Sequence, residues 1–376
     1  MHVGLNLVYL VPGETGGMEV VARELIPELA ALPGLRLTAF VNREAAERGG
    51  GPWGELVPME VVPVHARNRV AWVWGEQRHL PALAAAAGCD VVHSLASTAP
   101  LRGRFVRVTT IHDLNYKLVP ESHFGLLGLG MRVLVPAAAR RSHRLIVDAA
   151  STREDLANHL GTSRDKVDVA PLGVSVPADV APTPPAELRA KLDLDDRPLV
   201  VSLSAKRPHK NLPRLLRAVG GLAPERRPAL VVPGYPTPHE RELSELAAEL
   251  GIAELVRLPG WLPAEDLEGL YAAATCVAFP SLYEGFGLPV LEAMARGVPV
   301  ACSDRSSLPE VAGHAALLFD PEDVSAIRQA IERLLTDEPL RSRLAAAGRE
   351  RAAAFTWRRT AELTAASYAR ALAGGE

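Results

Sequence analysis

Short apolar runs alternate with helix-like stretches along this chain, and the alternation occurs twice. Each apolar run has the length of a buried strand, and stretches such as 18–32 have helical periodicity. Parallel strands need a crossover connection, which an intervening helix supplies. The pattern therefore predicts an α/β fold with two doubly wound, Rossmann-like parallel sheets. The expected strands are 3–10, 35–41, 90–93, 107–111, 144–147, 167–169, 199–203, 229–232, 256–258, 276–279 and 298–301.

The boundary between the two sheets is expected in a proline-rich segment. Residues 171–185 contain several prolines and no periodic apolar pattern, and the alternation starts again after them. The chain of 376 residues is also longer than one hydrophobic core usually holds. We therefore expect an N-terminal domain at 1–175 and a C-terminal domain at 176–357, with a last helix at 358–376 that joins the N-terminal domain.

Charge and cysteine usage exclude several classes of protein. The formal net charge is −3, so no basic field favours nucleic acid. Cys89, Cys276 and Cys302 are far apart and form no disulfide framework, which favours a reducing compartment. The N-terminus lacks the pattern of a signal peptide, and no apolar run is long enough for a membrane span. We therefore expect a cytoplasmic protein without a nucleic-acid partner.

A carboxylate and a glycine loop follow the expected strand 276–279. Glu284 precedes Gly285 and Gly287, and an apolar helix then carries Glu292. Unpaired N–H groups and the helix dipole converge at such a helix start and hold anions. Two carboxylates beside an anion site favour a ligand with phosphates and hydroxyls, such as a nucleotide-sugar. A buried capping carboxylate and a helix-dipole partner are the alternative interpretation. Glu292 is expected in the first helical turn, where it can accept both hydrogen bonds of a ribose diol.

Three cations follow the expected strand 199–203. Lys206, Arg207 and Lys210 lie at a strand-to-helix turn, where positive charge can neutralise a diphosphate leaving group. The same charge run also fits a solvated turn. Either Lys206 or Arg207 can be the first of the functional cations.

Two strands end in histidine or are followed by it. His93 ends the run 90–93, and His112 with Asp113 follows the run 107–111. Ligands of parallel sheets bind at the carboxyl ends of the strands. His112, Asp113 and His93 are therefore candidate site residues, although a lone histidine at a strand end is often structural.

Two further patterns are weak indications of a cofactor or a metal. The loop 13–17 is rich in glycine but is not G-x-G-x-x-G, and the second strand ends at Asn42 instead of an acidic residue. A nicotinamide cofactor is therefore not favoured. Asp193 and Asp195 form a D-x-D pattern, but they precede the first strand of the second domain and lie on the wrong side of its sheet. We expect no metal site.

Two sequences match a capping box, which marks the start of a helix. One is Ser151 with Glu154, and that helix is expected to end near Gly161. The other is Ser307 with Glu310, which predicts a structural role for Glu310.

An apolar segment at 120–136 is followed by the basic residues of 140–144. An apolar helix with a basic end can rest on an anionic membrane surface. A packed helix with a charged tip has the same pattern. Peripheral contact with the inner face of the membrane and simple packing both remain open for the segment 120–144.

The run Y-E-G-F-G-L-P-V-L-E-A-M-A-R-G-V-P-V at 283–300 resembles the retaining glycosyltransferases of family 4, the group 1 transferases. The sequences S-L-P-E-V-A-G at 307–313 and L-F-D-P at 318–321 are similar to that family as well. The resemblance is dense over 199–323 and thinner in the N-terminal half. It implies the GT-B fold, in which two Rossmann-like domains face each other across a cleft and the second holds the nucleotide-sugar donor.

The resemblance also implies roles for individual residues. Glu284 is expected to hydrogen-bond the donor sugar, and Glu292 the ribose. Arg207 and Lys210 are expected to neutralise the diphosphate, and His112 to contact the sugar near the reaction centre. The other donor-binding positions that it implies are Gly285, Phe286, Gly287, Leu288, Gly16 and Gly17.

These expectations together define a reaction. The resemblance predicts a retaining, metal-independent hexosyltransferase that uses no cofactor beyond its nucleoside diphosphate sugar, with GDP-mannose as the first candidate. The acceptor is a hydroxyl group of a saccharide, a lipid-linked glycan or a small molecule, in glycan, glycolipid or natural-product synthesis. A nucleotide-sugar epimerase or phosphorylase with the same fold, or an inactive sugar-nucleotide-binding protein, is the alternative.

Overall fold

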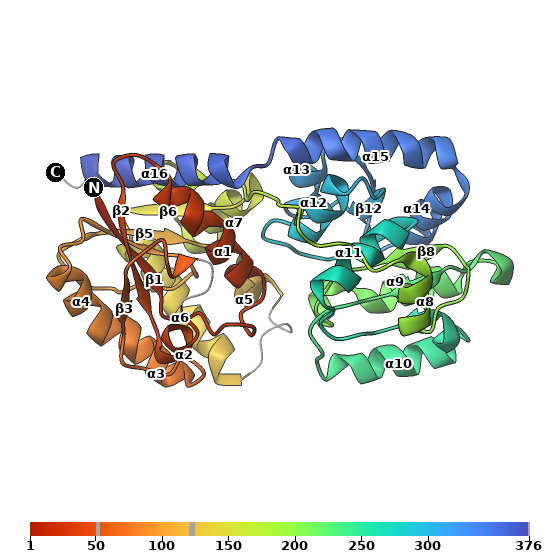
Figure 1. Cartoon of the computed structure of the whole chain (residues 1–376), viewed down its shortest axis with the longest axis horizontal. Coiled ribbons are helices and arrows are strands. Elements are labelled where there is room, and N and C mark those ends of the chain that lie inside the picture. The colour runs from red at the N-terminus through yellow and green to blue at the C-terminus, as the bar shows by residue number, and fades with distance from the viewer. Residues whose placement is uncertain (50–52, 120–124, 375–376) are drawn as a thin grey trace. The chain divides into compact units, whose positions relative to one another are not determined.

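The computed structural model describes residues 1–49, 53–119 and 125–374, and it divides into two compact units. The first unit contains Met1–Gly173 and Thr356–Glu376, and the second contains Val174–Phe355. Figure 1 shows the chain leaving the first unit once and returning to it with the last helix.

A parallel sheet forms the centre of the first unit. Over the described residues it has seven strands in the order β3-β2-β1-β4-β5-β6-β7. β1 pairs with β2 on one side and with β4 on the other, so the order in which strands are added reverses between β1 and β4. Doubly wound folds bind ligands at this switch point. The strands are β1 His2–Leu7, β2 Arg36–Val41, β3 Met59–Val61, β4 Val91–Ser94, β5 Val106–Thr110, β6 Arg144–Val147 and β7 Val167–Val169.

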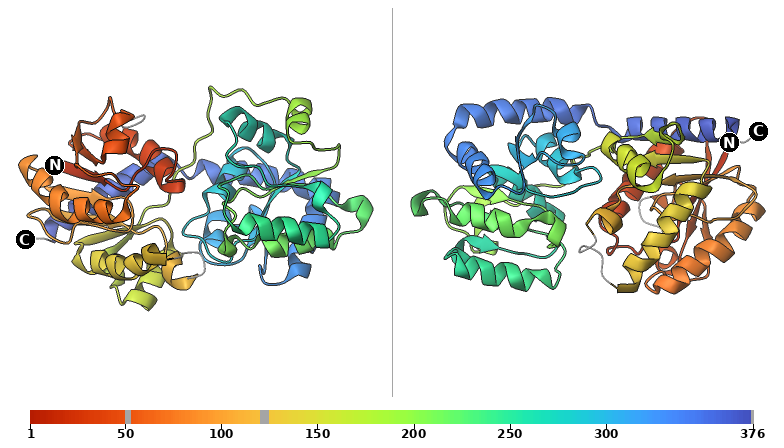
Figure 2. Two further views of the ribbon diagram at one scale, coloured as in Figure 1. Left: turned by 90° about the horizontal axis from the view of Figure 1, so that it is seen from below. Right: turned by 180° about the vertical axis from the view of Figure 1, so that it is seen from behind.

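Helices cover both faces of this sheet, as the two views of Figure 2 show. In α1 the buried residues Val21, Leu25 and Leu29 recur at helical spacing, which makes one face apolar. The glycine at the end of α7, Gly161, has a φ of 66°, a conformation that glycine adopts without strain. The helices are α1 Gly17–Ala30, α2 Arg43–Glu47, α3 Arg69–Trp74, the π-helix Gly75–His79, α4 Leu80–Ala86, α5 Asn115–Leu118, α6 Gly125–Arg141, α7 Ala150–Leu160, the 3-10 turn Arg164–Lys166 and α16 Trp357–Ala373.

The last helix, α16, is fixed to the first unit by buried polar contacts. The Tyr368 hydroxyl lies 2.7 Å from Nδ1 of His93, and Ser367 Oγ donates to Asp168 at 2.7 Å. At the helix start, Gly173 lies so close to the backbone of Trp357 that a Cβ would be 2.2 Å from its nitrogen. These contacts join α16 to strands β4 and β7 of the first sheet.

The second unit repeats the topology of the first. Its sheet has six strands among the described residues, in the order β10-β9-β8-β11-β12-β13. β8 pairs with β9 on one side and β11 on the other, so the switch point lies between β8 and β11. The strands are β8 Leu199–Val201, β9 Ala229–Val231, β10 Val256–Arg257, β11 Cys276–Phe279, β12 Val300–Ser303 and β13 Ala316–Phe319.

The core of the second unit consists of fully buried aliphatic side chains from its strands and helices. Helix α9 is strongly amphipathic and buries Leu215, Leu216 and Val219 in this core with Ile327 and Ile331 of α14. The helices are α8 Pro185–Lys191, α9 Leu212–Gly220, α10 His239–Glu249, α11 Ala264–Ala273, α12 Leu288–Ala295, α13 Leu308–Ala312, α14 Val324–Thr336 and α15 Glu338–Ala353, and the 3-10 turns are Pro208–Lys210, Pro224–Arg226 and Ala253–Leu255.

The alternation predicted from the sequence is confirmed, with boundaries that differ by a few residues. Strands β3 and β13 were not expected. Both lie at the edge of a sheet and contain exposed residues. β3 is only three residues long and contains Glu60, whereas β13 is apolar but only four residues long.

Both predicted capping boxes are wrong. Helix α7 begins at Ala150, so Ser151 lies inside it instead of before it. Ser307 does precede α13, but its side chain makes no cap to that helix. Its hydroxyl instead contacts the loop that contains Glu284, which is described below.

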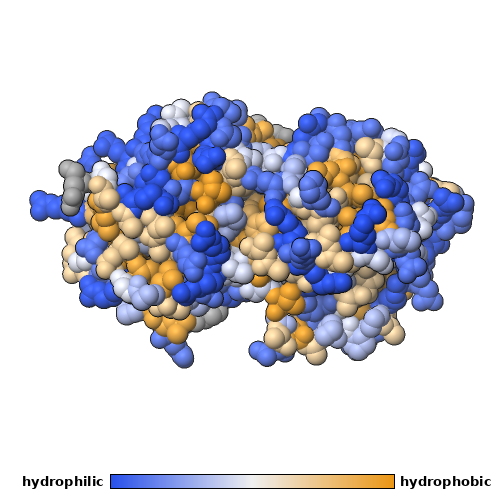
Figure 3. Space-filling view, turned by 90° about the horizontal axis from the view of Figure 1, so that it is seen from above, coloured by the Kyte–Doolittle hydropathy of each residue, from blue (hydrophilic) through white to orange (hydrophobic). Residues whose placement is uncertain are grey.

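The surface mixes polar and apolar side chains. On the face in Figure 3, apolar groups are small and interspersed with hydrophilic ones. Among the helices of residues 1–49, 53–119 and 125–374, none is long and apolar enough to cross a bilayer.

Candidate active site

The loops after β8 and β11 flank the switch point of the second sheet and contact each other directly. The N–H of Leu282 donates to the His209 carbonyl at 2.8 Å. Asn211, at a φ of 57°, donates its side-chain amide to the carbonyls of Pro280 at 3.0 Å and Pro321 at 2.7 Å. These bonds hold the two loops together at the edge where doubly wound sheets bind ligands.

The central contact of this edge joins Lys210 and Glu284. Nζ of Lys210 lies 2.7 Å from Oε1 of Glu284, and the side chains are only 15% and 11% exposed. The same ammonium lies 5.3 Å from the ring centre of Phe279. The structure therefore brings together a cation and a carboxylate that the sequence placed in separate motifs.

The glycine loop after Glu284 leads into helix α12. Gly287 has a φ of 108° and immediately precedes the first helical residue, Leu288. Within the described residues, the N–H groups of Phe286, Gly287 and Leu288 have no protein acceptor. They point from a helix start, where an anion is favoured by the dipole.

Glu292 was expected in the first turn of α12 but lies outside it. The helix begins at Leu288, so Glu292 is its fifth residue and lies in the second turn. Its Oε2 accepts a hydrogen bond from the Tyr271 hydroxyl at 3.1 Å. The Arg296 guanidinium stacks over the ring of Tyr271 at 4.5 Å, so the carboxylate is held by an ordered aromatic neighbour.

The three cations after β8 have different environments. Lys206 is fully buried, and its Nζ donates to the carbonyls of Gly234 at 2.9 Å and Pro259 at 2.6 Å. Burial lowers the pKa of Lys206, which the nearby Glu240 carboxylate opposes. Arg207 is exposed and, among the described residues, its side chain makes no hydrogen bond or ion pair. Lys210 is therefore paired with Glu284, Arg207 is exposed to solvent, and Lys206 connects the strand-end loops.

The glycine loop of the first unit lies at the carboxyl end of β1. Gly16 has a φ of 63°, and a Cβ built on Gly16 or Gly17 would meet no atom within 4 Å. The Glu19 carboxylate folds back onto the Gly13 N–H at 2.8 Å. The loop is therefore ordered and leaves open space at both glycines.

His112 lies after β5 and makes a hydrogen bond with each ring nitrogen. Nδ1 lies 2.7 Å from Oδ2 of Asp148, and Nε2 lies 2.8 Å from the Leu95 carbonyl oxygen. Both partners only accept, so both nitrogens carry hydrogens and the ring is a cation. Burial lowers the pKa of His112, but the Asp148 carboxylate and the two hydrogen bonds outweigh this and raise it to about 9.

His93 in β4 and Asp113 after β5, the other two candidates of the first unit, make structural contacts. His93 is fully buried between the Tyr368 hydroxyl and Thr110, and burial lowers its pKa to about 3. Asp113 accepts hydrogen bonds from the N–H and the side-chain amide of Asn115, both at 2.9 Å, which fix its own turn.

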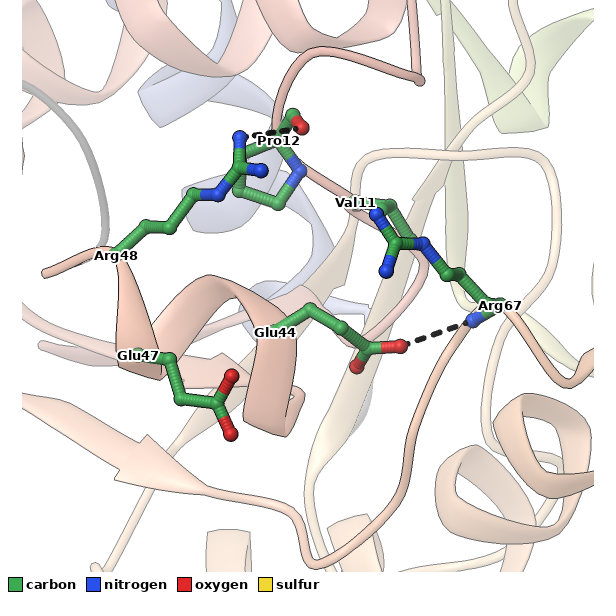
Figure 4. Close-up of a pocket in the computed structure, with 6 residues that line it drawn as sticks. All are labelled: Val11, Pro12, Glu44, Glu47, Arg48 and Arg67. Atoms are coloured by element: carbon green, nitrogen blue, oxygen red, sulfur yellow. Dashed lines mark hydrogen bonds between the residues drawn. The ribbon is translucent and has the colours of Figure 1, made fainter.

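A small charged pocket lies beside the glycine loop of the first unit. Figure 4 shows Arg48 and Arg67 above the carboxylates of Glu44 and Glu47, with Arg48 donating to the Pro12 carbonyl. Val11 completes the lining, and the volume is about 90 Å³. This lies below the roughly 300–1,000 Å³ of typical ligand pockets, so the pocket alone does not hold a sugar nucleotide.

The D-x-D pattern has the structural role that its position suggests. Asp193 pairs with Arg257 at 2.8 Å, and Asp195 pairs with Arg197 at 2.8 Å. Among the residues that the structure describes, no group of three or more His, Cys, Asp or Glu side chains is placed to hold a metal ion.

Several site residues were missed from the sequence. Asp148 directly follows strand β6, so a polar residue at a strand end could have indicated it. Glu76 gave no such signal because it lies within helical turns, yet it accepts from Asn6 at 2.8 Å, and burial raises its pKa to about 7. Ser306 and Ser307, which follow β12, contact the Glu284 loop. No spacing of residues in the sequence predicts that contact.

The repeated strand order and the carboxyl-end loops of both units define the GT-B class of glycosyltransferase folds. Sucrose-phosphate synthase from Thermosynechococcus elongatus has a similar structure, with a TM-score of 0.77 at 21% identity over 98% of each chain, which shows the fold.

Two family models and the curated relatives identify the family. The model described as "Glycosyltransferase Family 4" matches residues 15–176, and "Glycosyl transferases group 1" matches residues 185–351. O-antigen chain mannosyltransferase B of Escherichia coli is 34% identical over 267 residues, 69% of this chain and 69% of that protein. A D-inositol 3-phosphate glycosyltransferase of Frankia alni is 32% identical over 400 residues, 96% of each. The chain belongs to glycosyltransferase family 4 and is a glycosyltransferase.

Proposed function

We propose that this glycosyltransferase moves a hexose from a nucleoside diphosphate sugar to a hydroxyl acceptor, with retention at the anomeric carbon. The observation that carries the proposal is the Lys210–Glu284 pair, 2.7 Å apart, beside a helix start with unpaired N–H groups. Cationic and N–H groups suit a diphosphate, and a carboxylate suits the hydroxyls of a sugar.

The roles in the proposed reaction follow from these environments. Arg207, Lys210 and the start of α12 stabilise the charge that grows on the diphosphate as the C1–O bond breaks. Glu284 holds the sugar hydroxyls and Glu292 the ribose. The acceptor oxygen forms its bond to C1 on the same face, and its proton goes to the leaving phosphate oxygen. His112 is already protonated near neutral pH, so it stabilises charge instead of accepting that proton.

Two substitutions test these roles. Glu284→Gln keeps the shape and an oxygen that can accept from Lys210, but it removes the charge. We expect turnover to fall about a hundredfold or more. Glu292→Ala removes two hydrogen bonds to the ribose, so we expect mainly a higher donor KM. Glu245→Gln, on exposed α10, is the matched control and should leave both constants unchanged. Near-normal turnover in Glu284→Gln would refute the assignment.

Mannose with a GDP carrier is the proposed donor. The name of the Escherichia coli relative, a mannosyltransferase, supports mannose, whereas the Frankia alni relative is named a D-inositol 3-phosphate glycosyltransferase. Thermal-shift measurements with GDP-mannose, UDP-glucose and UDP-N-acetylglucosamine test the donor, because a bound ligand stabilises in proportion to RT ln(1 + [L]/Kd). A shift with UDP-sugars alone would exclude GDP-mannose.

Peripheral contact with an anionic membrane is the proposed role of α6. Residues 120–124 of the segment lie outside the described residues. In α6, Val133 is 68% exposed, and Arg140 and Arg141 are exposed at the other end. Sedimentation with phosphatidylglycerol vesicles should carry the protein down, and Arg140→Glu with Arg141→Glu should abolish this. Arg241→Glu on α10 is the control. Absence of wild-type binding would exclude the contact.

A further inference from the structure

Two adjacent serines after β12 hold the backbone of Glu284 from both sides. The Glu284 N–H donates to Ser306 Oγ at 2.9 Å. The Ser307 hydroxyl lies 3.0 Å from the Glu284 carbonyl and 2.7 Å from the Phe286 carbonyl, so its single hydrogen is shared between them. The peptide groups before and after Glu284 are therefore both fixed by a neighbouring loop.

The geometry of these serines is specific to this contact. Ser306 has a φ of 51°, a left-handed conformation that is uncommon outside glycine. Ser307 is fully buried, so its hydroxyl has no competing water. Strained backbone persists only where the surroundings over-determine it, and it concentrates at functional sites.

The loop after β12 that contains the two serines also contacts the end of the glycine loop. Leu308, the residue after Ser307, lies against Gly287, where an added Cβ would be 2.6 Å from its Cδ2. Ser306, Ser307 and Leu308 together contact the loop from Glu284 to Gly287. Lys210 contacts the carboxylate of Glu284 itself.

We propose that Ser306 and Ser307 are positioning residues that orient the Glu284 carboxylate toward the donor sugar. The inference rests on the proposed function, because it acts through Glu284. The serines do not need to touch the substrate. They act by fixing the peptide groups on either side of the Cα that bears the carboxylate, so that its position is set before the donor binds.

The first test is Ser306→Gly, measured with the donor that the wild type turns over in a panel of GDP-mannose and UDP-sugars. Glycine adopts the positive φ freely, so the substitution removes Oγ and relieves the strain together. A purely structural serine would then give equal or higher thermal stability and unchanged turnover. We expect kcat to fall about tenfold, with the KM for the donor changed less than about threefold.

Matched variants separate positioning from folding. Asp193→Gly relieves a positive φ of 51° elsewhere in the same unit and should leave kcat unchanged. Ser307→Ala should lower kcat further than Ser306→Gly because the Glu284 and Phe286 carbonyls share the Ser307 hydroxyl as donor and both lose it. Should Ser307→Ala fail to fold, Ser306→Gly alone decides the proposal.

The decisive measurement is the double variant Ser306→Gly with Glu284→Gln. If the serine acts through Glu284, the double variant has the turnover of Glu284→Gln, with no further loss. A full tenfold further loss, or unchanged kcat in Ser306→Gly, would overturn the positioning role. If Glu284→Gln itself keeps full turnover, the proposed function of Glu284 and the positioning role both fail. If Ser306→Gly keeps full turnover and Glu284→Gln does not, the positioning role fails and the proposed function stands.

Discussion

Removing the charge of Asp148 should change both the pKa of His112 and the stability of the folded chain. Asp148→Asn replaces the carboxylate with a neutral amide of the same shape, whose oxygen can still accept from Nδ1. Without the negative charge, burial dominates, and the pKa of His112 should fall below neutrality. The ring then carries one hydrogen at pH 7.5, so it can no longer donate to both the side chain and the Leu95 carbonyl.

The magnitude follows from the pKa of His112, which rises from 6.5 to about 9 in the folded chain. At about 1.4 kcal/mol for each pKa unit, this corresponds to at most about 3.5 kcal/mol. Burial also raises the pKa of Asp148, which offsets part of the gain. The side chains are 14% and 3% exposed, so solvent screening is small. We expect a net loss of about 1–2 kcal/mol in Asp148→Asn at pH 7.

The direction in which the pKa of His112 is shifted determines how its contribution to stability changes with pH. The folded pKa of His112 is raised, so its stabilisation is fully present below pH 6.5 and is lost as the pH rises through about 9. The difference in melting temperature between wild type and Asp148→Asn should therefore be about 2–8 °C near pH 6.5 and should shrink toward pH 9.5.

Proton NMR titration of the histidine rings and thermal unfolding measure the two effects. The His112 resonance is identified by its loss in His112→Gln, with His159→Gln as the matched control on an exposed residue. Asp165→Asn, an exposed aspartate in the same unit, controls for the removal of a charge. A wild-type His112 that titrates below pH 7, or a stability difference that grows toward pH 9.5, would refute the reasoning.

Three further predictions concern buried contacts. Tyr368→Phe leaves Nδ1 of His93 without its partner and should lower the melting temperature of the first unit by about 2–8 °C in calorimetry. Lys206→Met removes the buried ammonium from several carbonyls, so it should destabilise the second unit by about 3 kcal/mol or more in urea; an unchanged midpoint would contradict this. Gly287→Ala places a Cβ against Leu308 at a positive φ, and it should abolish donor-induced thermal shifts even where the protein folds.

The candidate site shows where sequence patterns suffice. Glu284, Lys210 and His112 were candidates because each lies in a loop after a predicted strand, and parallel strands place their carboxyl ends at one edge. Their contacts were not predictable. The sequence did not show that Lys210 and Glu284 pair directly or that His112 is held as a cation by Asp148, because these partners come from loops far apart in the chain.

Lys206 and Arg207 illustrate the limit most clearly. They are adjacent in sequence and alike in charge, and either could have been the first cation at the diphosphate. The fold buries Lys206 among carbonyls and leaves Arg207 exposed, because the two side chains leave the strand-end turn in different directions. The order of charged residues in the sequence does not show which of them is buried.

The sequence by itself determined the architecture of this glycosyltransferase, the strand-end loops and the glycine before α12, because these depend on local periodicity and backbone conformation. The tertiary structure alone decided which charges are neutralised, which serines contact Glu284, and that the Tyr271 hydroxyl donates to Glu292. Those features depend on distances between segments that are remote in sequence, and such distances exist only once the sheets have formed.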